Sequence, residues 1–206
     1  MEEREYLKDL TEIRSIMERS SRFISLSGLS GIMAGIYALA GACVAYNIIY
    51  QSPYILYDSI RTMDLSPGVV LLFADALAVI FLTIVTGIYL TAKKAKKEGL
   101  TVWDKSAQRL MINLFIPLAT GGAFILIIYL RGYYSIISSL LLIFYGLSLI
   151  NASKYTLSDI RYLGISEIIL GLVAAILPGY GLIFWTIGFG VLHLVYGIVM
   201  HYKYDR

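Results

Sequence analysis

Long apolar stretches separated by short polar connections make up most of this chain. A helix needs about 20 mainly apolar residues to cross the core of a bilayer, and six stretches are close to this length or longer. The pattern therefore predicts an all-α membrane protein, a bundle of six transmembrane helices. The predicted spans are about residues 23–50, 69–91, 107–130, 133–151, 162–178 and 181–201.

Composition supports a membrane protein. Hydrophobic residues make up 58% of the 206 residues, charged residues make up 15%, and the mean hydropathy is +0.74. A soluble globular domain has an apolar share of about 45–50%. The six spans leave little chain for a second folded domain, so we expect one bundle over residues 23–201 and a short cytoplasmic tail over 202–206. The first 22 residues are charged throughout, which argues against a cleavable signal peptide.

The first 22 residues are predicted to form a cytoplasmic amphipathic helix. Tyr6, Leu7, Leu10, Ile13 and Met17 recur at three- to four-residue spacing among charged residues. This apolar stripe has three possible partners: the ends of the other helices, the membrane interface or a cytoplasmic protein. The last possibility would make the protein a regulatory or scaffold protein.

Basic residues in the connections predict the orientation. With the N-terminus inside, the inner segments hold fifteen Lys and Arg residues, and the outer connections hold only Arg61 and Arg131. Basic residues concentrate on the cytoplasmic side of membrane proteins. Both termini are therefore predicted to be cytoplasmic. The net charge of +3 is explained by these flanking residues and does not indicate nucleic-acid binding.

Ionisable residues inside the spans are the candidate functional residues, because a charge in the bilayer core is costly. Glu167 in the fifth span and His193 in the sixth are predicted to lie at a similar depth in the inner half of the membrane. Arg109 and Asn113, at the inner start of the third span, share that level. Asp75 in the second span lies nearer the outer side.

Two interpretations of this predicted cluster stay open. In the first, Glu167 and His193 form a proton relay or bind a solute, an ion or a lipid headgroup, with His193 titrating near neutral pH. In the second, Arg109 neutralises Glu167, and His193 bonds a backbone carbonyl in a structural network. Asp75 has the same two alternatives: it faces a cavity open to the outside, or it pairs with a hydroxyl group on a neighbouring helix.

The chain shows no motif for a metal site, a nucleophile elbow or a phosphate-binding loop. No cofactor or metal is predicted, and an enzyme is the least favoured class. Small residues at four-residue spacing in the first span, Ser27, Gly31 and Gly35, indicate close helix packing. Such packing serves the bundle itself or a homo-oligomer equally well.

The segment from Gly171 to Gly179, GLVAAILPG, precedes a return helix with Gly188, Gly190 and Gly197. This hairpin resembles those of the small six-span bacterial proteins of the HdeD-like type, which are linked to acid resistance. The resemblance implies six spans and a bacterial inner membrane, and no functional residue is transferred from it. We expect an integral membrane protein that binds or transports a small solute, an ion or a lipid through its buried polar cluster.

Overall fold

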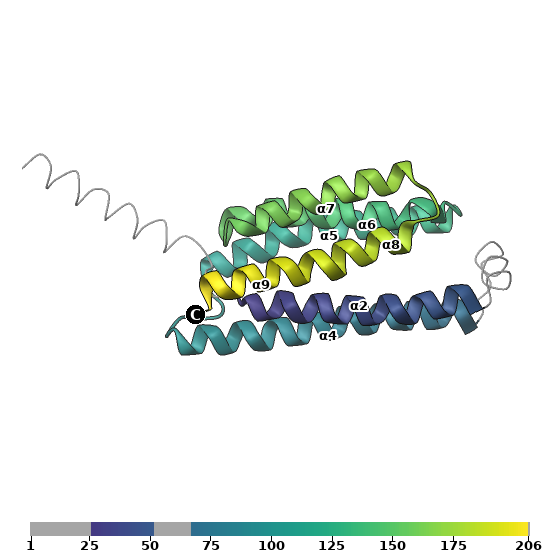
Figure 1. Ribbon diagram of the computed structural model, residues 1–206. Helices are drawn as coiled ribbons and strands as arrows, with labels where there is room; N and C mark the ends of the chain where they lie inside the picture. Colours follow the sequence, from purple (N-terminus) through teal and green to yellow (C-terminus); the bar gives the residue numbers. More distant parts are fainter. Residues whose placement is uncertain (1–25, 52–66, 206) are drawn as a thin grey trace, which may run out of the picture.

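The computed structural model of the protein describes residues 26–51 and 67–205 (Figure 1). These residues are helical almost throughout, and no strand occurs in the two described ranges. The main helices are α2 (Gly28–Gln51), α4 (Pro67–Lys97), α5 (Lys105–Leu130), α6 (Ile137–Ala152), α7 (Asp159–Ile176), α8 (Gly181–Trp185) and α9 (His193–Tyr204). Short 3₁₀ turns, η1 (Tyr134–Ile136) and η2 (Ser153–Tyr155), flank α6, and a π-helical segment, η3 (Thr186–Leu192), joins α8 to α9.

Among the described residues, five helical stretches are long and apolar enough to cross a membrane: 28–50, 67–97, 105–130, 134–155 and 181–204. Their outward faces carry large apolar side chains, and Leu77, Phe81 and Phe115 are each 65% exposed. A soluble protein rarely exposes apolar surface on this scale. These helices therefore indicate an integral membrane protein with several transmembrane helices.

The fifth predicted span corresponds to α7, which has 18 residues. It does not belong to the five apolar stretches because it carries three charged residues, Asp159, Arg161 and Glu167. The six-span count thus stays a prediction. The predicted N-terminal amphipathic helix at residues 1–22 lies outside the described residues, as does most of the connection that follows α2.

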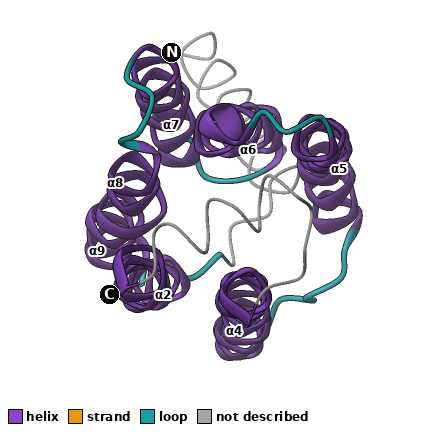
Figure 2. Ribbon diagram, turned by 90° about the vertical axis from the view of Figure 1, so that its right-hand side faces the viewer, coloured by secondary structure: helices purple, strands orange, loops and turns teal. Residues whose placement is uncertain are grey.

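The helices form a ring when the bundle is viewed along its length (Figure 2). Close packing runs from α4 to α2, from α2 to η3 and α9, from the last helices to α7, and then through α6 to α5. Within the described ranges, α4 and α5 do not pack closely on each other, although they follow one another in sequence. The ring therefore has one loosely packed seam, between α4 and α5.

The two ends of the bundle differ. One end, here called the basic end, gathers the start of α2, the lysines at the end of α4 and the last turn of α9 (Figure 1). The opposite end, the tyrosine end, holds Tyr50, Tyr129, Tyr133 and Tyr180. Tyrosine is common at membrane interfaces, and lysine is concentrated on the cytoplasmic side of membrane proteins.

Glycine allows the closest helix contacts. A Cβ on Gly31 would lie 3.1 Å from the Cα of Gly197, and one on Gly35 would lie 2.7 Å from the carbonyl oxygen of Gly190. The small-residue face predicted from Gly31 and Gly35 therefore packs on the last helix of the same chain. The homo-oligomer that this face also suggested stays a prediction.

Candidate functional site

Glu167 is the most completely enclosed ionisable side chain in the described part of the protein, with no exposed surface. It lies on α7 and points towards the π-helical segment η3. A Cβ on Gly188 would lie 2.5 Å from Glu167 Oε2, so the glycine makes the room that the carboxyl group occupies. Neither carboxyl oxygen has a hydrogen-bond partner among the residues that the structure describes. An unsatisfied buried polar group is rare in native structures and calls for an explanation.

His193 is the nearest polar neighbour of Glu167. Its Nδ1 lies 3.5 Å from Glu167 Oε1 and 3.0 Å from the carbonyl oxygen of Gly188. Its Nε2 lies 2.6 Å from the hydroxyl of Tyr145 on α6. Because the Gly188 carbonyl can only accept, Nδ1 donates, and one neutral tautomer then lets Nε2 accept from Tyr145. The order of groups is Tyr145, His193, Glu167.

Aromatic rings hold the imidazole in place. Phe189, within η3, stacks on His193 with ring centroids 5.9 Å apart, and it also contacts Tyr145 with centroids 5.0 Å apart. The π-helical segment supplies Gly188 and Phe189 on the turn before His193. Such segments inside α-helices frequently occur at functional sites.

A cavity of about 220 Å³ lies beside these residues, in the half of the bundle nearer the basic end. Tyr145 and His193 line it, whereas Glu167 lies behind His193 and is not part of its wall. The wall is mainly apolar and comes from α2, α4, α5, α6, α7 and α9. Its residues are Leu26, Ser27, Gly28, Ser30, Gly31, Ala34, Thr83, Gly87, Leu110, Leu114, Tyr145, Leu149, Ala152, Thr156, Ile160, Leu163, His193, Tyr196, Gly197 and Met200.

The structure brings Glu167 and His193 together, which their similar predicted depths allowed but did not require, and it does not add Arg109 or Asn113. Arg109 is exposed and makes no ion pair with a described residue. Asn113 accepts two hydrogen bonds from Asn151, one at its backbone oxygen (2.9 Å) and one at its side-chain oxygen (3.2 Å). The predicted neutralisation of Glu167 by Arg109 is therefore absent from this arrangement.

Asp75 lies apart from the cluster. It is half-buried on α4 and faces α2, where a Cβ on Gly41 would lie 3.4 Å from Asp75 Oδ2. It lines neither this cavity nor a second hollow that Val69 and Phe73 border. The predicted pairing with a hydroxyl group is not observed with any described residue either.

Sequence reasoning missed Tyr145. It is the only tyrosine in the middle of the predicted fourth span, and this was the one available signal. Its role depends on the rotation of α6 about its own axis, and the almost uniformly apolar sequence of that helix does not reveal this rotation.

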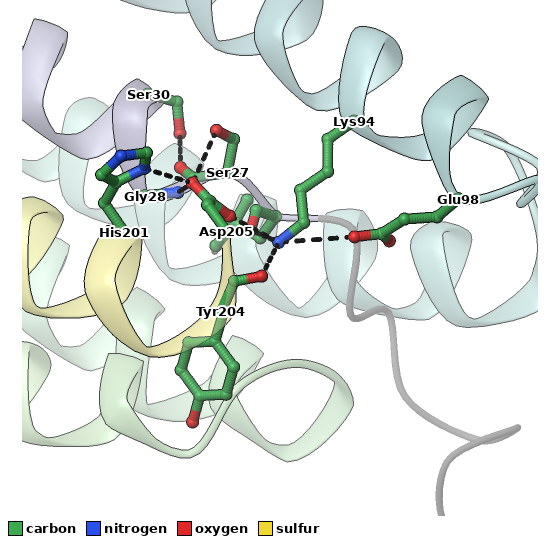
Figure 3. A network of polar contacts seen from close by, with 9 residues as sticks. Ser27, Gly28, Ser30, Lys94, Glu98, His201, Tyr204 and Asp205 are labelled. Atoms are coloured by element: carbon green, nitrogen blue, oxygen red, sulfur yellow. Dashed lines mark hydrogen bonds and ion pairs between the residues drawn. The ribbon is translucent and has the colours of Figure 1, made fainter.

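A second polar cluster, here called the Asp205 network, lies at the basic end (Figure 3). Asp205 Oδ1 accepts a hydrogen bond from Lys94 Nζ at 2.7 Å. Its Oδ2 accepts from the backbone N–H of Gly28 at 2.9 Å and from His201 Nδ1 at 3.0 Å. Lys94 also donates to the backbone oxygens of Leu26 and Tyr204. The network ties the last residues of the chain to the first turn of α2 and the last turns of α4.

Partial burial opposes the charge on Asp205, but the hydrogen bonds from Lys94 and His201 outweigh it and lower the pKa of this carboxyl group. A neighbouring pair behaves in the same way. Asp159 accepts from Lys203 at 2.9 Å and from the hydroxyl of Tyr204 at 2.6 Å. Burial opposes its charge too, yet these bonds lower the pKa of Asp159.

No group of three or more His, Cys, Asp or Glu side chains arranged to hold a metal ion occurs among residues 26–51 and 67–205. Comparisons of the chain with protein-family models, with characterised proteins and with solved structures found no match.

Proposed function

We propose that this protein binds or transports a small molecule in the membrane, and that its site is the cavity bordered by Tyr145 and His193. One observation carries the proposal. Glu167 is fully buried within the bundle, and neither of its oxygens has a hydrogen-bond partner within residues 26–51 and 67–205. A side chain kept only for stability is expected to have its polar atoms satisfied, because each unsatisfied group costs about 1–3 kcal/mol.

The order of groups supports a proton relay. An imidazole that accepts a proton on one ring nitrogen can release one from the other. His193 has Tyr145 at Nε2 and Glu167 near Nδ1, so it can pass a proton between the cavity side and the buried carboxyl group. A ligand that binds in the cavity would then change the protonation state of Glu167. Ligand binding would be coupled to protonation in this way.

In this proposal the protein has six membrane spans, and α7 is the fifth of them. The helix packs along α6, and a Cβ on Gly164 would lie 2.7 Å from the carbonyl oxygen of Gly146. Asp159 and Arg161 lie in its first turn, at the basic end, so Glu167 is the only acidic or basic residue of α7 left within the membrane. With the basic end cytoplasmic, both termini are inside, and the inner membrane of a bacterium is the proposed location.

The test is the thermal stability of the detergent-purified protein between pH 5 and pH 8, with and without a panel of small solutes and lipids. The variants are Glu167→Gln and His193→Ala, and Asp75→Asn is the matched control because it also changes a carboxyl group to an amide inside a span. We expect a pH-dependent or ligand-dependent shift in the unfolding temperature that both site variants lose and the control keeps. Variants that lower stability without changing either response would show that the cluster is structural.

A further inference from the structure

The described part of the wall of the cavity beside Tyr145 and His193 carries no charge. None of the lining residues within 26–51 and 67–205 is Asp, Glu, Lys or Arg. Taking an ion out of water costs several kcal/mol unless an opposite charge or several hydrogen bonds compensate. The wall offers only hydroxyl groups, backbone groups and the imidazole of His193, which already has its partners. An ionic ligand would therefore be left largely uncompensated.

The described wall is mainly apolar, and its polar side chains are those of Ser27, Ser30, Thr83, Tyr145, Thr156, His193 and Tyr196. Of these, Tyr145 and His193 are hydrogen-bonded to each other beside the cavity. The Tyr145 hydroxyl donates its proton to His193, so its oxygen keeps lone pairs that can accept from a ligand. A ligand that fits this wall is mainly apolar and carries one donor group. A cavity of about 150 Å³ in another protein holds benzene, so about 220 Å³ suits a molecule somewhat larger than one aromatic ring.

The loosely packed seam between α4 and α5 borders this cavity, which Thr83 and Gly87 line from α4 and Leu110 and Leu114 from α5. A second hollow of about 460 Å³ lies between the same two helices nearer the tyrosine end. Its wall is almost wholly apolar and includes Phe73, Gly122 and Tyr129. An apolar molecule dissolved in the bilayer thus finds an apolar surface along this seam both at the cavity and at the second hollow.

From these observations we infer that the cavity takes a neutral, mainly apolar molecule with one hydrogen-bonding group, and not an ion. The inference rests on the proposed function and narrows its ligand class. The donor group of the molecule bonds the Tyr145 oxygen, and its apolar body lies against the walls formed by α2, α4 and α5.

Two glycines supply a matched pair of variants. A Cβ on Gly87 and a Cβ on Gly122 each meet nothing within 4 Å, so a larger side chain enters open space without moving the backbone. Gly87→Leu fills the cavity, and Gly122→Leu fills the second hollow. Both changes replace glycine by a better helix former, so neither variant is expected to lose its fold.

The probes are 2-phenylethanol, ethylbenzene, phenylacetate and 2-phenylethylammonium, which share one skeleton and differ in charge and hydrogen bonding. The measurement is the shift in unfolding temperature of the purified full chain as each probe is titrated. We expect 2-phenylethanol to give a saturable shift and the two ions to give none. Gly87→Leu should raise the half-saturating concentration at least tenfold, Gly122→Leu should leave it unchanged, and Tyr145→Phe should raise it about fivefold by removing one hydrogen bond.

Two results would overturn the inference and leave the proposed function standing. One is a saturable shift with either ion that Gly87→Leu removes. The other is a loss of the 2-phenylethanol response in Gly122→Leu alone, which would place the site in the second hollow. If none of the four probes shifts the unfolding temperature, the inference fails as well. The proposed function is then judged separately, by the pH response of Glu167→Gln and His193→Ala.

Discussion

The two polar clusters of this protein are built on opposite principles. In the Asp205 network, each carboxyl oxygen accepts at least one hydrogen bond, and Lys94 supplies the opposite charge. In the cluster of Tyr145, His193 and Glu167, the carboxyl group of Glu167 accepts none from a described residue, and its nearest polar neighbour is an imidazole 3.5 Å away. A network whose polar atoms are all hydrogen-bonded holds helices together. A buried carboxyl group without hydrogen bonds does not stabilise the fold in this way, so stability does not explain its presence.

Their positions in the bundle sharpen the contrast. The Asp205 network closes the basic end and joins α2, α4 and α9, which are distant in sequence. Glu167 lies eight residues further along α7 than Asp159 at the basic end, which is about 12 Å deeper in the bundle at about 1.5 Å per residue. A missing hydrogen bond costs more there, because water does not replace the lost partner. Functional sites often sacrifice stability in this way.

The largest expected effect comes from breaking the Asp205 network. Asp205→Ala removes the closest counter-ion of Lys94, and the side chains of Asp205 and Lys94 are only 8% and 11% exposed. We expect the free energy of unfolding to fall by about 3 kcal/mol, as for other buried ion pairs that lose one partner. Unfolding in mixed detergent micelles measures the change.

Glu98→Gln is the control for Asp205→Ala. Glu98 also pairs with Lys94, but at 4.0 Å and with 37% of its side chain exposed. Exposed pairs contribute only about 0–1 kcal/mol. Equal losses in Asp205→Ala and Glu98→Gln would show that the network is not the stabilising element described here.

A smaller effect is expected from acid. The pKa values of Asp205 and Asp159 are lowered in the folded protein from an ordinary value of 3.8. Their stabilisation is therefore fully present above pH 3.8 and is lost as the pH falls through the lower folded values. We expect the wild type to lose stability steeply below about pH 4. The double variant Asp205→Asn/Asp159→Asn should be less stable at neutral pH and show a shallower loss in acid.

Equilibrium unfolding at fixed pH values between 3 and 6 provides this measurement. An unchanged slope in the double variant would mean that other carboxyl groups govern acid unfolding, and that the two ion pairs contribute little to the closure of the basic end.

The smallest effect on stability should come from the cluster that matters most for function. Glu167→Gln keeps the shape of the side chain and removes its ability to ionise, while no hydrogen bond is lost because none is made. We expect the free energy of unfolding to change by less than about 1 kcal/mol. The same variant should lose the pH and ligand responses of the wild type.

Circular dichroism and thermal unfolding of Glu167→Gln beside Asp205→Asn give a direct comparison of the two clusters. A loss of stability in Glu167→Gln as large as that in Asp205→Asn would remove the contrast and favour a structural role for Glu167.

Much of the fold could be predicted from the sequence because the signals are local. The apolar stretches located five helices that can cross a membrane, and the depth count brought Glu167 and His193 to one level. The ends of the helices were predicted less accurately. The predicted second span ended near Thr91, but α4 continues to Lys97, because lysine is a good helix former and Lys94 is held in the Asp205 network.

The candidate site was predicted in part. Arg109 was expected beside Glu167 because the two share a depth, but depth does not determine which way a side chain faces around its helix. Tyr145 and Gly188 were missed for the same reason. The Asp205 network joins residues up to 178 positions apart, so no local sequence pattern predicts it.

By itself, the sequence indicated that the chain belongs in a membrane and predicted how deep the ionisable residues of its spans lie, because hydrophobicity and helical rise act residue by residue. Only the tertiary structure decided which of these residues meet. Helix rotation depends on close contacts between small residues far apart in the chain, such as Gly31 with Gly197 and Gly146 with Gly164. Those contacts turn Glu167 towards His193 and leave it without a hydrogen bond.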